Sequence, residues 1–171
     1  MSNALLIFDV HGPFPVPLQK ERNGCFIERN CPAFWRQHQH YANKFGCYVF
    51  ALKAGRGVKP IYVGKTANRF DRECFTSDKI AGHYTPALAR KGKGTPVLFL
   101  LIPEMRKGKP NGKVIDDLET FLIQVGAAKN PELSNIQHKK EARWGIRGVI
   151  RYGKGKPSSG AQQFRRGMRI S

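Results

Sequence analysis

The chain has 171 residues, of which 40% are hydrophobic and 11% aromatic, and its 30 Lys and Arg residues outnumber 12 Asp and Glu to give a formal charge of +18. This composition is too apolar for a disordered polycation, so one domain with a sizeable core and a polyanionic partner is expected. The longest apolar run, at 97–102, has six residues, and the N-terminal apolar segment lacks a basic leader, so membrane insertion and secretion are disfavoured.

The first 45 residues hold short apolar segments separated by prolines. Residues 4–10 are a candidate strand, and residues 14–18, with prolines at alternate positions, suit an edge strand or an extended arm. The four cysteines of the chain are isolated and show no Cys-x-x-Cys spacing, which favours free thiols in a reducing, cytoplasmic compartment. We therefore expect an N-terminal extension that packs on the main body of the protein.

The clearest elements begin at residue 46. Residues 47–52 and 61–63 are rich in β-forming side chains, and the Gly- and Pro-containing segment 53–60 between them predicts a hairpin loop. The two segments are therefore expected to pair as antiparallel strands. A helix capped by Asn68 is expected over 69–80 and a second helix over 85–90, followed by a buried strand over 95–102.

The next helix carries an isolated acid beside its apolar face. Apolar residues recur with helical spacing over 114–125, and Glu119 lies at the edge of this stripe. The neighbouring Asp116 and Asp117 are expected to point further towards solvent. A carboxylate beside apolar side chains needs a cation, a metal or a hydrogen-bond donor, so Glu119 is either a rim residue or a ligand.

The C-terminal stretch 137–171 carries ten basic residues and only one acid, Glu141. Such a segment neutralises phosphates and binds nucleic acid without choosing a sequence, and its interleaved aromatic residues make a pure solubility role less fitting. Its repeated glycines argue against a clean amphipathic helix and hence against a membrane-surface role.

The ordered landmarks resemble those of the GIY-YIG nuclease family. Gly46-Cys47-Tyr48 and Tyr62-Val63-Gly64 stand on the two predicted strands, and Arg72 follows on the predicted helix. Glu119 lies on a later helix and Asn135 follows it. The resemblance covers about residues 46–136, a little over half of the chain. Gly64-Lys65-Thr66 is not the end of a P-loop, because Lys59 occupies the position where that motif requires glycine.

The resemblance implies a role for each of these residues. Glu119 would hold one Mg²⁺ or Mn²⁺ ion per active site, and Arg72 would contact a non-bridging phosphate oxygen. Tyr48 would act as general base, and Tyr62 would orient the water or the phosphate. Lys65 would favour the phenolate as a nearby cation, while Gly64 and Asn135 would support the site.

The resemblance also implies the architecture. We expect an α+β fold in which a small central antiparallel three-stranded sheet is flanked by helices, with a β or irregular N-terminal extension and a basic C-terminal tail. The corresponding segments are 1–45, a catalytic domain at 46–136, and 137–171. Nucleic-acid contacts are expected from Arg56, Lys59, Arg69, Lys107, Lys109, Arg143, Arg147, Arg151, Lys154, Lys156, Arg165 and Arg166.

The expected function is that of a metal-dependent endonuclease acting on DNA, in a monomer or a homodimer. Thr76 stands where many relatives carry a His or Tyr that supports proton transfer, and His83 is too distant in sequence to be assumed as a substitute. This departure keeps two alternatives open. One is a DNA- or RNA-binding module without cleavage, and the other is a nuclease that cleaves RNA.

Overall fold

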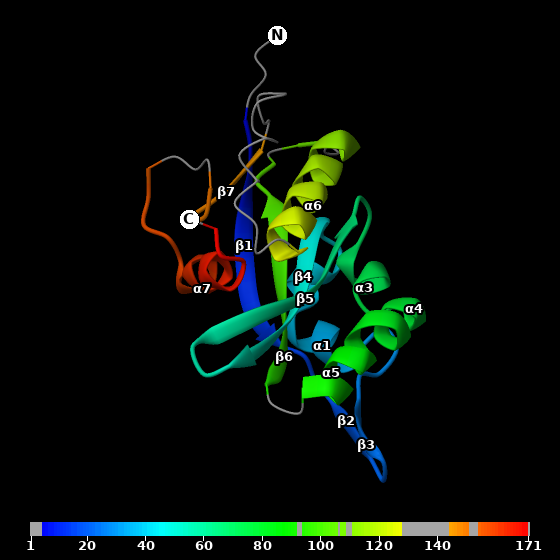
Figure 1. The fold of residues 1–171 in the computed structure, drawn as a ribbon. Coiled ribbons are helices and arrows are strands. Elements are labelled where there is room, and N and C mark those ends of the chain that lie inside the picture. The colour runs from blue at the N-terminus through cyan, green and yellow to red at the C-terminus, as the bar shows by residue number, and fades with distance from the viewer. Residues whose placement is uncertain are drawn as a thin grey trace.

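A five-stranded sheet forms the centre of the fold, in the order β5-β4-β6-β1-β7. The computed structural model describes residues 5–91, 94–105, 107–108, 111–127, 144–150 and 154–170. Neighbouring strands are antiparallel except β7, which runs parallel to β1, and the sheet curls into a half-barrel (Figure 1). The strands are β1 (Leu6–Pro15), β4 (Gly46–Ala54), β5 (Gly57–Thr66), β6 (Thr95–Pro103) and β7 (Trp144–Ile146).

The expected small three-stranded antiparallel sheet is therefore wrong, although the α+β class holds. The predicted strands correspond to β4, β5 and β6, but β1 pairs with the far side of β6 and β7 pairs with β1. The apolar strand β6 is buried along most of its length, and such a strand is most stable with a partner on both sides. The N-terminal segment and the basic C-terminal segment thus contribute strands to the same sheet rather than an extension and a tail.

The β4–β5 hairpin confirms the predicted antiparallel pairing. Its turn is shorter than the predicted loop, because only Gly55 and Arg56 separate the two strands. Tyr48 lies opposite Gly64, and the register shifts after Phe50, the partner of Tyr62. Because β5 is the outermost strand, its outer edge has no strand partner among the described residues.

One face of the sheet is covered by short helices. A cluster of buried aromatic side chains, including those of Phe50, Phe70 and Tyr84, fills the space between these helices and the sheet. The helix expected over 69–80 is broken, since Thr76 is extended, with a ψ of 154°. The elements of this face are α1 (Pro32–Gln37), α2 (Gln39–Ala42), α3 (Phe70–Glu73), α4 (Ser77–Lys79), the π-helix η1 (Ile80–Tyr84) and α5 (Thr85–Lys91). A separate hairpin of β2 (Gln19–Glu21) and β3 (Gly24–Phe26) projects from the body (Figure 1).

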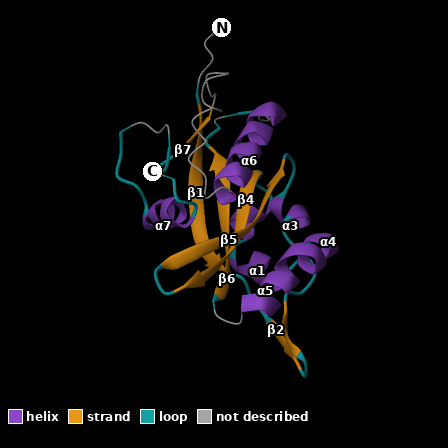
Figure 2. Cartoon of the chain, viewed as in Figure 1, coloured by secondary structure: helices purple, strands orange, loops and turns teal. Residues whose placement is uncertain are grey.

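The opposite face carries α6 (Gly112–Ala127) and α7 (Ser159–Gly167), shown in purple in Figure 2. The predicted apolar stripe of α6 is buried against the sheet, with Leu118 and Leu122 fully inaccessible to solvent. Each such leucine contributes about 2 kcal/mol through burial. None of the helices in the described ranges is long and apolar enough to cross a membrane.

The helix α7 overturns the expectation that glycines prevent an amphipathic helix near the C-terminus. Phe164 on its apolar side packs edge-to-face against Phe99 of β6, with ring centroids 5.3 Å apart. A Cβ atom at Gly160 would lie 2.1 Å from the backbone oxygen of Gly12 in β1. Glycine at this position therefore permits the close approach of helix and sheet rather than breaking the helix.

Candidate catalytic and nucleic-acid-binding site

The two motif strands pack the side chain of Tyr48 directly over Gly64. A Cβ atom at Gly64 would lie 2.3 Å from the ring carbon Cζ and from the hydroxyl oxygen of Tyr48. Any side chain at Gly64 would collide with the phenol, so the tyrosine and the glycine are coupled by their cross-strand pairing. The spacing of the two motifs thus has a packing reason in this fold.

The hydroxyl of Tyr48 is enclosed in this packing. The residue is 0% exposed, and its hydroxyl has no hydrogen-bond partner among the residues that the structure describes. Burial raises the pKa of Tyr48 above its usual range, and neighbouring ionisable groups, first among them Cys74, raise it further. This environment opposes formation of the phenolate and therefore opposes the general-base role expected for Tyr48.

Tyr62 occupies a more open position on the same face. Its ring centroid lies 6.2 Å from that of Tyr48, and the ring is partly exposed. The imidazole of His83, exposed on η1, packs on Tyr62 with a centroid separation of 4.4 Å. The fold therefore brings next to Tyr62 a histidine that is 21 residues away in sequence.

Lys65 and Glu119 meet on the opposite face of the sheet. The ammonium nitrogen of Lys65 lies 2.6 Å from Oε2 of Glu119 and 3.1 Å from Oδ1 of Asp116. Lys65 pairs across the hairpin with Cys47, which is buried in the cluster under α6. The contact with Glu119, followed by that with Asp116, raises the pKa of Lys65 and keeps the ammonium charged.

Arg72 lines an open groove at the end of β5. The groove has a volume of about 520 Å³, and the residues after Lys65 form one of its walls. Arg72 is exposed, whereas Arg69 in the same groove is held by the carboxylate of Asp71, with its Nε 2.9 Å from Oδ1. Of the two arginines, Arg72 is therefore the one whose guanidinium is open to a ligand. The described residues that line the groove are Phe45, Thr66, Ala67, Asn68, Arg69, Arg72 and Glu73.

The carboxylates of Glu119 and Asp116 match a hard divalent cation in kind, since both offer oxygen ligands. They are three residues apart on α6, and the ammonium of Lys65 lies between them in contact with both. A metal ion here would compete with Lys65 for these oxygens. No group of three or more His, Cys, Asp or Glu side chains suited to a metal occurs within the described part of the chain.

The predicted basic contacts separate into three groups. Arg147 is engaged by two carboxylates, those of Asp9 and Glu104, so it braces the turn after β7 and is not free for phosphate. Lys109, Arg143 and Arg151 lie outside the described residues, as does Asn135, which was expected to support the site. The remaining basic side chains, apart from Arg69, are exposed at the hairpin, after β6 and around α7, namely Arg56, Lys59, Lys107, Lys154, Lys156, Arg165 and Arg166.

The chain matches no family model, no curated protein and no solved structure. The roles proposed for individual residues therefore rest on the geometry of the fold and on the resemblance of the sequence motifs.

The structure brings three further residues, which were not predicted as site residues, into contact with the predicted ones or into the same pocket. His83 reaches Tyr62 through the π-helix, for which the sequence offered no signal. Asp116 could have been found, because a residue three positions before Glu119 shares its side of a helix. Arg169 joins Arg165 and Arg166 around a pocket at the end of α7.

Proposed function

We propose that this protein is a divalent-metal-dependent endonuclease that hydrolyses phosphodiester bonds in DNA. The observation that carries the proposal is the convergence of three separated segments at one end of β5. Lys65 of that strand contacts Glu119 of α6, and the residues that follow Lys65 form a wall of the groove lined by Arg72. A cation, a carboxylate pair and a free arginine at one strand end suit a phosphate and the ion that would accompany it.

The outer edge of β5 would let one substrate reach side chains that project from both faces of the strand. Tyr62 and His83 lie on one side, whereas Lys65 and Glu119 lie on the other. A nucleic-acid strand running along this edge would contact both groups without entering the core. Arg72 would bind a non-bridging phosphate oxygen through its planar donors.

We assign the proton acceptor to His83 rather than to Tyr48. His83 is exposed, and histidine is the side chain that most often accepts a proton from an attacking water. Tyr62, packed on the imidazole, would fix its orientation. A Mg²⁺ or Mn²⁺ ion held by Glu119 and Asp116 would supply Lewis-acid stabilisation of the phosphate charge.

The test is relaxation of supercoiled plasmid with Mg²⁺ and with EDTA. Arg72→Ala, Glu119→Gln and His83→Gln should each lower the rate at least about 100-fold, the range typical for loss of a charge-stabilising or proton-transfer group. Arg22→Ala on the β2–β3 hairpin and Asp117→Asn on the exposed side of α6 are the matched controls, and both should cleave at the wild-type rate. Equal cleavage by all five variants would contradict the proposal.

The second candidate is a nucleic-acid-binding module without cleavage. It is favoured by the Lys65 ammonium, which already pairs with both Glu119 and Asp116, and by the buried hydroxyl of Tyr48. In that case the protein would bind DNA or RNA with a steep salt dependence and leave plasmid intact with Mg²⁺ and Mn²⁺. Parallel cleavage assays on matched DNA and RNA duplexes would distinguish the RNA-cleaving alternative.

A further inference from the structure

The end of α7 has arginine in a backbone conformation that favours glycine. Arg169 has a φ of 52°, in the left-handed region. The amide of Ile170 donates to the carbonyl of Arg165 and the amide of Arg169 donates to that of Arg166, which together form a Schellman ending. Glycine is the usual residue at the left-handed position of this motif, because it lacks a Cβ. An arginine there carries a conformational penalty that glycine would avoid.

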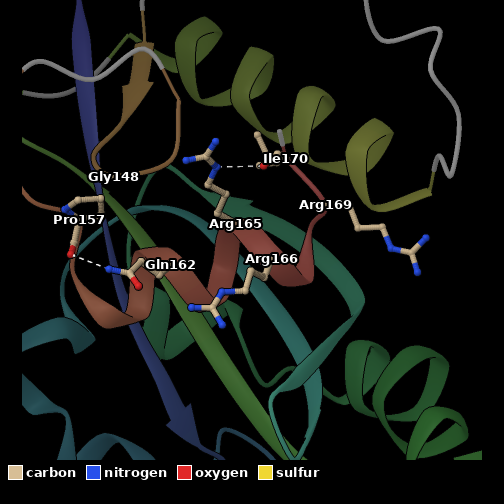
Figure 3. Close-up of a pocket in the computed structure, with 7 residues that line it drawn as sticks. All are labelled: Gly148, Pro157, Gln162, Arg165, Arg166, Arg169 and Ile170. Carbon is tan, nitrogen blue, oxygen red and sulfur yellow. Dashed lines mark hydrogen bonds between the residues drawn. The ribbon is translucent and has the colours of Figure 1, made fainter.

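Arg169 lies beside two further arginines around a pocket of about 470 Å³ (Figure 3). Gly148 and Pro157 contribute to the opposite wall, and none of the described residues lining the pocket is acidic. Arg165 has a structural role, since its Nε donates to the carbonyl oxygen of Ile170 at 3.1 Å. Arg166 and Arg169 are exposed and carry no such contact among the described residues. Their charges are therefore open to an anion.

The two open guanidinium groups leave the helix end in different directions (Figure 3). This divergence suits phosphates at separate points along a strand better than one small anion. The hairpin extends the same surface, because a Cβ at Gly167 would lie 2.8 Å from Cβ of Val58 in β5. Arg56 at the hairpin turn is exposed, whereas Lys59, the neighbour of Val58, points to the other face of β5.

We propose that the end of α7 is a phosphate-backbone subsite for nucleic acid, in which Arg166 and Arg169 contact separate phosphates and the β4–β5 hairpin continues the track. The proposal identifies nucleic acid as the partner of the proposed nuclease. It rests on the proposed function only in giving the subsite the role of presenting the substrate. Its binding contacts are distinct from the groove lined by Arg72, because the two pockets share no lining residue.

Equilibrium binding of a fluorescent 20-base-pair duplex, measured in EDTA at several salt concentrations, tests the subsite independently of cleavage. Each phosphate contact contributes about 0.9 to the slope of log K against log salt concentration. Arg166→Gln and Arg169→Gly should each reduce the slope by about 0.9, and the double variant by about 1.8. Arg169→Gly should also raise the Tm by about 2–4 °C, because glycine adopts the left-handed backbone without the penalty that arginine carries. The same variant should therefore be more stable and bind the duplex less tightly.

The matched control removes two exposed cations from the β2–β3 hairpin, which projects away from α7 (Figure 1). The Lys20→Ala/Arg22→Ala variant should retain the wild-type slope. An unchanged slope in the double α7 variant would overturn the proposal, as would an equal reduction in the control. Loss of binding to phosphatidylserine vesicles with unchanged duplex binding would also overturn it and assign the arginines to a lipid surface. Loss of plasmid cleavage alone would bear on the proposed nuclease and leave this subsite standing.

Discussion

The hydroxyl of Tyr48 allows a test of how burial affects an unpaired polar group, because a second buried tyrosine, Tyr84, has a hydroxyl that is hydrogen-bonded. Tyr48 and Tyr84 are both 0% exposed. The hydroxyl of Tyr84 donates to the backbone oxygen of Cys74 at 2.7 Å, whereas that of Tyr48 has no partner among the described residues. Replacement of each by phenylalanine removes one oxygen and keeps the ring, so the change isolates the hydroxyl.

The two substitutions are expected to change the free energy of unfolding in opposite directions. Tyr48→Phe removes a desolvated and unpaired polar group and should stabilise the protein by about 1 kcal/mol. Tyr84→Phe removes a buried hydrogen bond, leaves the Cys74 carbonyl unpaired and should destabilise the protein by about 1–2 kcal/mol. At about 2–4 °C per kcal/mol for a chain of this size, the two values of Tm should differ by about 4–12 °C.

Urea unfolding followed by circular dichroism provides the free energies, and the plasmid assay provides the activity of the same samples. If Tyr48→Phe destabilises the fold as much as Tyr84→Phe, the Tyr48 hydroxyl has a partner and the reasoning from its burial fails. Cleavage at the wild-type rate by Tyr48→Phe is expected, since the pKa of Tyr48 is raised by burial. A loss of about 100-fold with binding retained would restore Tyr48 as the general base.

Two further predictions concern packing and pH. Gly64→Ala would place a Cβ atom 2.3 Å from the Tyr48 ring and should destabilise the protein by about 2–3 kcal/mol in urea unfolding, and Tyr48→Ala should be less harmful in the Gly64→Ala background than in the wild type. Burial lowers the pKa of His11 despite the opposing effect of Asp9, so the unfolded chain binds the proton more tightly than the folded one. The stability contributed by neutral His11 should be complete above about pH 6.5 and decline as the pH falls towards the lower folded pKa. His11→Gln should flatten this part of a pH series of urea unfolding curves. An unchanged pH dependence in His11→Gln would contradict the prediction and show that the imidazole in contact with the Tyr41 hydroxyl does not change its protonation on folding.

Several parts of the fold followed from short stretches of sequence. The strands β4, β5 and β6 and the buried stripe of α6 were predicted, because residues close in sequence carry the periodicity that marks a buried face. The helix expected over 69–80 was less predictable. Its composition permits a continuous helix, but the extended Thr76 divides it and leads into the π-helix that carries His83.

The pairing of β1 with β7 shows where local signals end. Leu6 of β1 lies opposite Trp144 of β7, and these residues are separated by most of the chain. Nothing near either residue encodes the partner, since pairing depends on the exposed edge of β6 and on the side chains that α6 and α7 bring to the sheet. The basic C-terminal segment was therefore expected to be a tail, whereas residues 144–146 complete the sheet and α7 covers it.

For the candidate site, the chemical groups could be predicted from the residues alone: paired tyrosines, an arginine, a lysine and a carboxylate in a basic chain. Which of these groups meet depends on the folded chain. It places Tyr48 beneath the surface, His83 against Tyr62, and Lys65 between Glu119 and Asp116. The physical reason is that successive residues of a strand point to opposite faces, so neighbours in sequence separate while distant residues on one face come into contact. The charge of +18 was evident from composition, but its sorting into braces such as Arg147 and open cations required the folded chain.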